Sequence, residues 1–392
     1  MIALYLTTSK MKILAIYFGS ENGTNPVYDR VLANIAARQG IEMDLLRNFP
    51  VGEHNKIDNI RTHYHLTFTK KMGSWYRKCV RWFGTTPISD RWSKQAAEIV
   101  AQDYDVVLAL CANSQLTPAV CGRIIAQKVG CKFAIYGVDA IPAPGGWVRK
   151  KNDYNGRLRI VRRNWSAADY VASANKHMLE YQLSTFKHKP NLQTSVVYTT
   201  SPDEWHINPP SKRPLFLYTG NLYGLRTPDH LFGAFKRILA ERPDAELMLV
   251  GMKFKLRHFK KILTPEEQKH VTIAPYTDNL APLFAEAQVL LDIDADRQKD
   301  PFLSSKIASY LRVNRVIVCE TGKDTPSREL FAGYRTILQC NHSAESMYEG
   351  MKRALAMAEK EIDFSERQPL IDLFSVEHNC DTLCTDLERL LS

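Results

Sequence analysis

The sequence predicts an α/β fold made of two domains, each built on a parallel β-sheet. In both halves of the 392-residue chain, short apolar runs of strand length alternate with stretches of helical periodicity. A polar, proline-rich segment, Ser201–Pro214, lies between the halves and has the composition of a linker. We therefore place an N-terminal domain at residues 1–200, a linker at 201–213, a C-terminal domain at 214–374 and a terminal helix at 375–392.

The composition excludes several classes of protein. No run of about 18 apolar residues occurs, so the sequence predicts no membrane-spanning helix. The N-terminus, MIALYLTTSK, is too short and too polar for a signal peptide. The eight cysteines form no C-x-x-C pairs, which favours buried thiols in a reducing cytoplasm over a metal site. We expect a cytoplasmic protein that has no metal and no cofactor of its own.

The first half reads as a series of strand–helix repeats. Its apolar strands are expected at Met11–Phe18, Ile41–Leu46, Asp105–Cys111 and Lys132–Val138, and its helices at Pro26–Gln39 and Pro118–Val129. The loop after the first strand, Gly19–Asn25, carries small residues and hydroxyls ahead of a helix, which is a common anion cradle. This loop resembles the Gly-Ser-x-x-Gly-Thr phosphate loop of flavodoxin-like proteins. The alternative is a tight turn that needs the conformational freedom of glycine.

The formal charge of +10 indicates an anionic partner, which is a lipid surface, a nucleotide or a nucleic acid. The segment Arg61–Trp92 concentrates this charge and mixes it with aromatic residues. Its cations are Arg61, Lys70, Lys71, Arg77, Lys78, Arg81 and Arg91, and its tryptophans are Trp75, Trp82 and Trp92. Such a mixture suits an anionic membrane surface, where rings lie among headgroups. The alternative is a helix pair that packs its aromatic residues inward and leaves its cations in solvent.

A second candidate loop follows the strand Lys132–Val138. It begins at Asp139 and continues as Ile-Pro-Ala-Pro-Gly-Gly-Trp147. A loop at the carboxyl end of a parallel strand is a frequent site rim. Asp139 is therefore a candidate catalytic or acceptor-binding acid, and the cap of a turn is the equal alternative.

The second half repeats the pattern. Strands are expected at Leu215–Thr219, Ala245–Gly251 and Val271–Ala274, and helices at Pro228–Leu239 and Leu280–Ala287. The stretch Val289–Glu320 then forms a strand, a loop with acids and hydroxyls, a helical pattern and a β-branched strand. This is a βαβ unit, and parallel sheets bind ligands at the carboxyl ends of their strands. Lys306 stands where the helix begins, which suits a phosphate or sugar hydroxyls.

Within this stretch, FLSSKIASYLRVNRVIV resembles a segment of glycosyltransferases with the GT-B fold, of the retaining bacterial family-four type that makes surface polysaccharides. In that family the segment reads Pro-Ser-Lys, two apolar residues, an acid, Tyr-Leu, Gly and Pro-Val-Ile, and it binds the nucleotide-sugar donor. The resemblance implies two Rossmann-like domains facing a cleft, with a C-terminal helix crossing back to the N-terminal domain. It also places the glycine loop after the first strand on the acceptor side.

The resemblance implies a set of site residues. Arg226 matches the basic residue that contacts the donor diphosphate, and Tyr276 and Thr277 match the loop beside the nucleobase. The implied donor residues are Gly220, Asn221, Arg226, Tyr276, Thr277, Asp296, Ser304, Ser305, Lys306 and Ser309, the catalytic acids are Asp139 and Asp300, and the acceptor-side residues are Gly19, Asn22, Gly23 and Thr24.

This chain departs from the family pattern at four positions. Ser309 replaces the acid that holds the ribose hydroxyls, Asn314 replaces a glycine, and Asn221 replaces an earlier arginine. Asp300 stands one place away from the first acid of the family's paired-acid motif. The equivalence of Asp300 is therefore open.

The favoured function is transfer of a sugar from a nucleotide-diphosphate sugar to an acceptor hydroxyl. The expected acceptor is a lipid-linked saccharide at the inner face of the cell membrane, with no nucleic-acid partner. One alternative is a GT-B protein that binds a nucleotide without turnover, suggested by Ser309. Another is a flavodoxin-like flavin protein, although no G-x-G-x-x-G follows any strand. A nucleic-acid binder would explain the charge but not two parallel-sheet halves.

Overall fold

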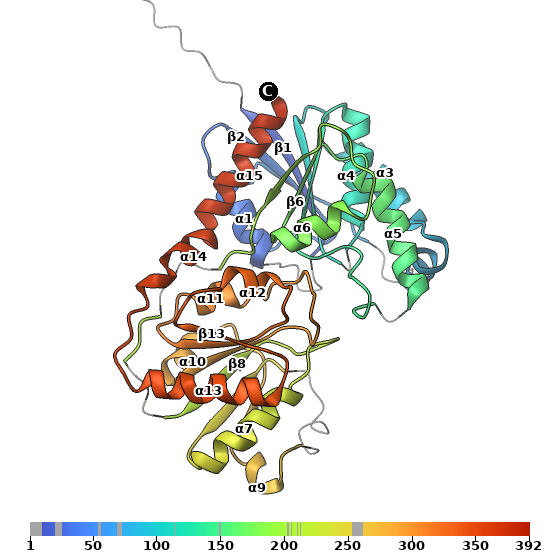
Figure 1. Cartoon of the computed structure of the whole chain (residues 1–392). Coiled ribbons are helices and arrows are strands. Elements are labelled where there is room, and N and C mark those ends of the chain that lie inside the picture. Colours follow the sequence, from blue (N-terminus) through green and yellow to red (C-terminus); the bar gives the residue numbers. More distant parts are fainter. Residues whose placement is uncertain are drawn as a thin grey trace, which may run out of the picture. The chain divides into compact units, whose positions relative to one another are not determined.

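The computed structural model describes residues 10–19, 26–53, 56–68, 73–113, 115–148, 150–201, 204, 206–209, 211, 213–252 and 262–392. The chain divides into two compact units (Figure 1). The N-terminal unit comprises the chain up to Thr200 together with Val376–Ser392, and the C-terminal unit comprises Ser201–Ser375. Both are α/β units with parallel sheets, as the sequence predicts.

The described part of the N-terminal unit contains a sheet of seven strands in the order β3-β2-β1-β4-β5-β6-β7. Every neighbouring pair is parallel, with Met11 beside Ile41 in the first pair. The strands are β1 (Met11–Tyr17), β2 (Ile41–Arg47), β3 (Thr62–His65), β4 (Val106–Cys111), β5 (Lys132–Gly137), β6 (Tyr170–Ser173) and β7 (Gln193–Val196). The chain passes outward from β1 on one side and returns to β4 on the other, which is a doubly wound topology.

Alternate residues of β1 enter two different cores, as the period of a strand requires. Ile13 and Ala15 join the core under α1 (Pro26–Ala36) and α15 (Val376–Leu391), whereas Leu14 and Ile16 join the core on the opposite face. That face is covered by α3 (Pro87–Ile99), α4 (Thr117–Val129), α5 (Lys151–Trp165) and α6 (Lys176–Leu183). A shorter helix, α2 (Gly73–Lys78), continues as a π-helical turn, η3 (Cys79–Phe83).

The terminal helix α15 belongs to the N-terminal unit although the C-terminal unit precedes it in the chain (Figure 1). Its apolar residues Leu383 and Leu387 lie in one core with Val31 and Leu32 of α1. Spacing of four residues places both leucines on one helical face, which the sequence already showed. The return of the chain to its first unit agrees with the predicted fold class.

In the C-terminal unit, the described strands form a six-stranded parallel sheet in the order β10-β9-β8-β11-β12-β13. They are β8 (Leu215–Thr219), β9 (Glu246–Val250), β10 (Val271–Ala274), β11 (Val289–Ile293), β12 (Val316–Glu320) and β13 (Ile337–Cys340). The helices and turns are α7 (Asp229–Glu241), α9 (Pro265–Gln268), α10 (Ala281–Glu286), α11 (Ile307–Tyr310), α12 (Pro326–Leu330), α13 (Ala344–Ala358), η4 (Ser365–Arg367) and α14 (Gln368–Leu373). Helices α7 and α13 share one core with the sheet, and Gly233 allows their close approach because a Cβ there would lie 2.8 Å from Ala344.

The segment expected to link the domains packs on the C-terminal unit over its described residues. The Ser201 hydroxyl donates to the Ala308 carbonyl at 3.1 Å, and the His206 amide donates to the Arg312 carbonyl at 2.9 Å. The Ser211 hydroxyl donates to the carbonyl of Glu286 at 2.7 Å. The proline-rich, polar segment is therefore extended, and the carbonyls that accept its hydrogen bonds lie in the C-terminal unit.

None of the helices in the described ranges combines the length and the hydropathy that a membrane span requires.

Candidate functional site

The strand order of the C-terminal sheet defines where a ligand is expected. The chain runs outward from β8 to β9 and β10, and then returns to β11 on the other side of β8. Loops that leave β8 and β11 at their carboxyl ends diverge, and doubly wound sheets bind their ligands at such a point. The predicted donor residues Gly220, Arg226 and Asp296 follow these two strands.

The loop after β8 brings bare backbone to this edge. Gly220 has a φ of +112°, and its amide donates to the Val250 carbonyl at 2.8 Å. Gly251, with a φ of +83°, lies against it, since a Cβ at Gly251 would be 3.7 Å from the Gly220 backbone. Both conformations favour glycine. The loop is therefore compact, and Gly220 lies close to Lys306, because a Cβ at Gly220 would be 3.3 Å from Lys306 Cε.

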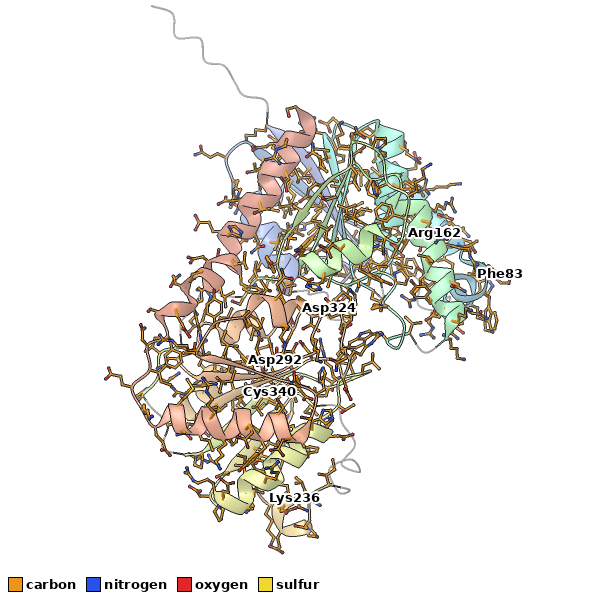
Figure 2. The ribbon with its side chains drawn as sticks, in the orientation of Figure 1. Phe83, Arg162, Lys236, Asp292, Asp324 and Cys340 are labelled. Carbon is orange, nitrogen blue, oxygen red and sulfur yellow. The ribbon has the colours of Figure 1, made fainter. Side chains whose placement is uncertain are left out.

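Lys306 is the cation most firmly held at this edge. Its Nζ donates to Asp292 Oδ1 at 2.8 Å and to Ser304 Oγ at 3.0 Å, and it lies 4.5 Å from the ring centre of Tyr218. Its side chain is 15% exposed, whereas that of Asp292 is 2% exposed. Burial is the largest single influence on the pKa of Lys306 and lowers it, but Asp292 together with Tyr218 and Tyr310 raises the pKa above its usual value. Figure 2 marks Asp292 among the strands of the C-terminal unit.

Arg226 faces a second buried acid, Asp294. Burial is the largest single influence on the pKa of Arg226 and lowers it, but the combined effect of Asp294, the strongest of the opposing groups, and of its neighbours raises the pKa above its usual value. Burial and the nearby Asp292 raise the pKa of Asp294 to about 6, while Arg226 acts in the opposite direction. The site is therefore a group of two cations and two acids that neutralise one another inside the protein.

Backbone bonds tie the loops of this group together. The Asp296 amide donates to the Leu225 carbonyl at 3.0 Å, which joins the loops after β11 and β8. The Tyr310 hydroxyl accepts from the Thr219 amide at 2.8 Å, which fixes α11 to the end of β8. Gly220, Arg226, Asp296 and Lys306 are thus brought together.

Sequence reasoning omitted several residues of this group, namely Asp292, Asp294, Tyr218 and Tyr310. A signal existed for the acids, because Asp292 and Asp294 alternate along the end of an apolar strand and so share one face. Tyr310 stands at the tyrosine of the family's Tyr-Leu pair, a signal that was not used. Tyr218 carried no signal, since an aromatic residue in a buried strand is ordinarily part of a core.

A pocket of about 230 Å³ in the C-terminal unit adjoins α11, the helix that follows Lys306. Ser309 lines it together with Glu204, His206, Asp278 and Phe284. The rings of His206 and Phe284 lie 5.2 Å apart, centre to centre, so a planar ligand would find an aromatic wall next to polar groups. Sequence reasoning missed Glu204, which supplies a carboxylate to the pocket of Ser309.

The predicted nucleobase loop borders this pocket through Asp278. Tyr276 is 72% exposed and its hydroxyl donates to Asp278. The Thr277 hydroxyl accepts from the Asn279 amide at 3.1 Å, which makes it a turn-forming group. Asn221 is half-buried in the loop after β8, and Ser305 is exposed beside the buried Ser304.

Asp300 lies in the loop between β11 and α11, as Asp296 does, and is 2% exposed. Its amide donates to the Asp324 carbonyl at 3.2 Å, across from the loop that follows β12. Only glycine fits at position 322 in that loop, because a Cβ would lie 2.1 Å from the carbonyl oxygen of Arg297.

Asp139 lies in the N-terminal unit, after β5. One of its carboxylate oxygens accepts from the Asn113 amide at 2.9 Å, and the Asn113 side chain accepts from the Ala143 amide at 3.1 Å. Asp139 therefore caps the turn after β4 and shapes the loop that carries it. On the acceptor-side loop, the Gly19 amide donates to Asn48 at 3.2 Å, whereas Asn22, Gly23 and Thr24 lie outside the described residues.

The basic, aromatic segment Arg61–Trp92 divides into buried and exposed parts. The expectation that Trp92 lies at a membrane surface is wrong: it is 4% exposed, contacts Phe18 and Phe68, and donates to the Leu66 carbonyl. Arg61 is likewise engaged, because it pairs with Asp44 at 2.7 Å. Trp92 lies on the buried face of α3, and its contacts in the core outweigh the tendency of tryptophan to lie at a membrane interface. Lys70 and Lys71 lie outside the described residues.

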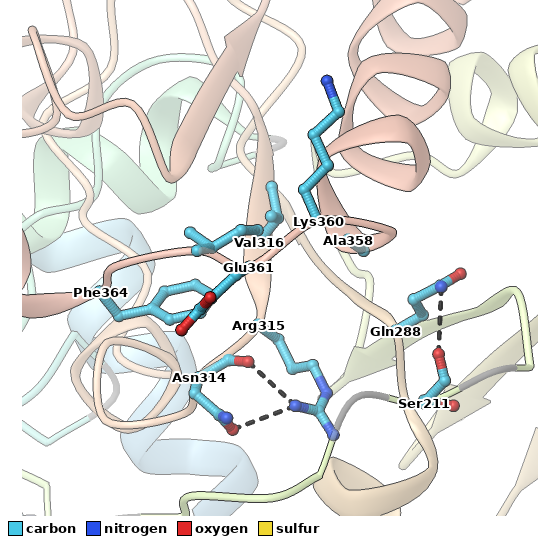
Figure 3. Close-up of a pocket in the computed structure, with 10 residues that line it drawn as sticks. Ser211, Gln288, Asn314, Arg315, Val316, Ala358, Lys360, Glu361 and Phe364 are labelled. Carbon is cyan, nitrogen blue, oxygen red and sulfur yellow. Dashed lines mark hydrogen bonds between the residues drawn. The ribbon is translucent and has the colours of Figure 1, made fainter.

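A further pocket, of about 210 Å³, surrounds Arg315 at the start of β12 (Figure 3). Arg315 donates to the side-chain oxygen of Asn314 at 3.1 Å and to the Pro209 carbonyl at 2.8 Å. The Gln288 side chain donates to the Ser211 carbonyl at 3.1 Å. This pocket lies at the amino ends of the strands, so it is separate from the group around Lys306.

No protein-family model matches the sequence, and a search of curated proteins finds no match. Solved structures do match over nearly the whole chain. A glycosyltransferase from Rickettsia africae has a TM-score of 0.70 at 14% identity, covering 98% of this chain and 99% of its own. Anabaena HepE, solved with UDP and glucose, has a TM-score of 0.66 at 14% identity, covering 97% and 100%. The lipopolysaccharide outer core galactosyltransferase WaaB has a TM-score of 0.64 at 14% identity, covering 95% and 98%. The chain has the GT-B fold.

Proposed function

We propose that this protein is a glycosyltransferase that takes its sugar from a nucleotide-diphosphate donor. The observation that carries the proposal is the group of Gly220, Arg226 and Lys306 at the switch point between β8 and β11. A glycine loop and two cations at the carboxyl edge suit a diphosphate. The fold adds support, because the similar solved structures include glycosyltransferases and a protein bound to UDP.

In this proposal the bond between the anomeric carbon and the diphosphate breaks, the acceptor oxygen bonds to that carbon, and the acceptor proton passes to the departing diphosphate. Arg226 and Lys306 stabilise the charge that develops on the leaving diphosphate. Helix α11 spans only Ile307–Tyr310, so its dipole adds little and the side chains carry this task. Asp139 and Asp300 are the candidate catalytic acids, and the family-four resemblance favours retention of the anomeric configuration.

A panel of nucleotide diphosphates and nucleotide sugars tests the proposal directly. A ligand that binds the native state raises the melting temperature, so one base and one sugar should give the largest rise. UDP and UDP-glucose head the panel because HepE was solved with both. If no nucleotide raises the melting temperature or binds in calorimetry, the proposed donor site is excluded.

Arg226 should contribute directly to diphosphate binding. We expect Arg226→Met to weaken binding of the best nucleotide diphosphate by roughly 1.5–3 kcal/mol, the range for a charge-assisted hydrogen bond. Arg226→Lys is the matched control, because it keeps the charge facing Asp294 but loses the planar fork. It should retain part of the affinity. Calorimetry that finds equal affinity in the parent and in Arg226→Met removes Arg226 from the site.

Ser309 should hold the ribose more weakly than a carboxylate would. We expect Ser309→Glu to tighten donor binding, because an ionised acceptor makes stronger hydrogen bonds to hydroxyls than a neutral one. Glu204 lines the same pocket, so Glu204→Gln measures what the existing carboxylate contributes. If Ser309→Glu binds no better while Glu204→Gln binds worse, Glu204 already fills the role.

A GT-B protein that binds without turnover is the second candidate, and Ser309 together with the pairing of Lys306 to Asp292 favours it. Nuclear magnetic resonance of a mixture of donor and acceptor separates the two. Formation of a new anomeric signal supports the enzyme and also gives the stereochemical outcome. Tight nucleotide binding without any product across a broad acceptor panel supports the second candidate.

For the acceptor, we propose a lipid-linked saccharide met at the cytoplasmic face of a membrane. The support is an exposed apolar group on α2 and η3, in which Trp75 is 51%, Trp82 57% and Phe83 69% exposed. Figure 2 shows Phe83 at the surface of the N-terminal unit. Exposed cations Arg77 and Lys78 lie on the same elements. Rings beside cations are the composition of an interfacial anchor.

The π-helical turn that carries Trp82 and Phe83 is held in place by α5. A Cβ at Gly156 would lie 1.9 Å from the Val80 carbonyl oxygen, so the two backbones touch. Arg159 donates to the Trp82 carbonyl at 3.3 Å. The rings of Trp82 and Phe83 therefore lie on a turn that α5 holds in place, which suits a surface that binds a membrane.

Flotation with anionic liposomes tests this surface. Each cation near an anionic leaflet contributes about 1 kcal/mol, and salt screens it, so recovery should be high at low salt and fall near ~0.5 M. Trp82→Ser with Phe83→Ser should abolish recovery and leave nucleotide binding intact. Ile207→Ser is the matched control, because Ile207 is 66% exposed in the other unit. A parent protein that ignores anionic liposomes at low salt makes a soluble acceptor the better proposal.

A further inference from the structure

Three side chains with metal-ligating atoms converge at the carboxyl edge of the C-terminal sheet. His230 is the second residue of α7, Glu320 is the last residue of β12, and His342 follows the end of β13 by two residues. Strands β12 and β13 are parallel neighbours, so their carboxyl ends meet. Helix α7 starts beyond the loop that leaves β8 at the same edge. The sheet topology thus gathers residues that are distant in the sequence.

The geometry of this His–Glu–His cluster is that of a set of ligands around one point. The Nδ1 atoms of His230 and His342 lie 2.6 Å and 3.1 Å from the same oxygen, Glu320 Oε1. One potential ligand atom from each residue lies within 4.8 Å of the others. The two imidazole rings are 6.3 Å apart, centre to centre, and their planes differ by 34°. Small movements of the side chains would bring all three to coordination distance from one ion.

The cluster also contains polar atoms that the described residues leave unsatisfied. Glu320 is 2% exposed, and its second oxygen, Oε2, has no hydrogen-bond partner in the part of the chain that the structure describes. Nε2 of His342 is buried and equally unpartnered there, on a side chain that is 3% exposed. A buried carboxylate with an unused oxygen costs free energy, which coordination would recover. Because Nε2 of His342 has no hydrogen-bond partner among the described residues, the ring can present either nitrogen to an ion.

The electrostatics of the cluster favour a cation. The Glu320 carboxylate lies against both imidazoles, and the charge of Asp296 acts on both rings as well. With both imidazoles neutral, the cluster keeps the negative charge of Glu320 and of the acids near it. Two protonated imidazoles beside each other would repel, whereas one divalent ion supplies the same charge at a single point.

We propose that His230, Glu320 and His342 bind one divalent transition-metal ion, with Zn²⁺ the favoured ion. Two imidazole nitrogens and one carboxylate form a three-ligand set that zinc accepts, with a water in the fourth tetrahedral position. His230 is 27% exposed in its side chain and provides the side from which the ion enters. The bound ion ties the start of α7 to the ends of β12 and β13. This proposal is independent of the donor site, and it departs from the expectation of a protein without metal.

The test uses the full chain, freed of metal with a chelator and titrated with Zn²⁺ alone. Calorimetry should show one equivalent bound, and zinc should raise the melting temperature. Substitution with Co²⁺ should give the visible bands of a tetrahedral site without a thiolate charge-transfer band, because the ligands are nitrogen and oxygen. A thiolate band would overturn the proposal by assigning the ion to cysteine.

Variants locate the ion. Removing a group that hydrogen-bonds to a metal ligand typically lowers metal affinity about 10–100-fold. Removing a ligand itself, in Glu320→Gln or His342→Gln, should therefore lower zinc affinity by about 100-fold or more. His230→Gln, at the most exposed of the three positions, repeats the test if a buried variant fails to fold. His270→Gln is the matched control, because His270 contacts the Ala245 carbonyl in the same unit. A parent that binds no stoichiometric zinc, or variants that bind like the parent, would overturn the proposal.

Discussion

Lys306→Met is expected to lower the free energy of unfolding by about 3–5 kcal/mol, the range for breaking a buried ion pair by removing one partner. The substitution leaves Asp292, whose side chain is 2% exposed, without the ammonium that lies 2.8 Å from its carboxylate. Urea unfolding measures the change. Because Lys306 also faces the proposed diphosphate, the variant should lose nucleotide binding as well.

Two further variants separate the ion pair from the loss of a lysine as such. Lys299→Met removes a lysine that is 79% exposed and pairs with Asp324 at 2.7 Å, so its effect should stay within about 1 kcal/mol. Adding Asp292→Leu to Lys306→Met should recover much of the stability, because no buried charge then remains. The recovered double variant should still fail to bind nucleotide. A loss near zero for Lys306→Met would show that the pair is not buried as described.

Arg367→Met is expected to have an effect of similar size, about 3–5 kcal/mol, through hydrogen bonds. The side chain of Arg367 is fully buried, and it donates to the carbonyls of Val313, Arg315 and Thr336 at 2.7–3.0 Å. A hydrogen bond from a charged donor contributes roughly 1.5–3 kcal/mol, and the total stays below the sum of the bonds because the Val313 and Thr336 carbonyls keep the amides of Arg315 and Ile317 as donors. The Val313 and Arg315 carbonyls lie between α11 and β12, and that of Thr336 precedes β13, so the substitution loosens the segment between α11 and β12.

Arg335→Met is the matched control for this prediction. Arg335 is 77% exposed and pairs with Glu366 at 3.4 Å, so its removal should change stability by no more than about 0.5 kcal/mol. Hydrogen exchange of the amides in 311–315 should accelerate in Arg367→Met and not in Arg335→Met. Unchanged exchange together with unchanged stability would contradict the role of Arg367.

The sequence by itself predicted the central strands of both sheets, whereas β3, β7 and β13 were not predicted. The runs Leu215–Thr219 and Val271–Ala274 have the same bounds in the structure. Leu215–Thr219 is apolar almost throughout because it is buried on both faces, and Val271–Ala274 is a partly exposed edge strand. The sequence also determined Gly220 as a loop residue and the amphipathic face of α15, since φ preference and helical period are local properties. The site residues named from the family resemblance remain predictions, although the structure brings Gly220, Arg226 and Lys306 together.

Only the tertiary structure decided which charges meet and which aromatic residues are buried. Lys306 and Asp292 are 14 positions apart, and Glu320 joins two histidines from other elements. Trp82 and Trp92 each follow an arginine in the same basic, aromatic segment, yet Trp92 is 4% and Trp82 57% exposed. Which distant residues pair depends on strand order and helix packing. The local pattern of charge and hydrophobicity along the chain does not determine either of these. Burial then fixes the energy of each pair, because the same two charges attract strongly in the interior and weakly in water.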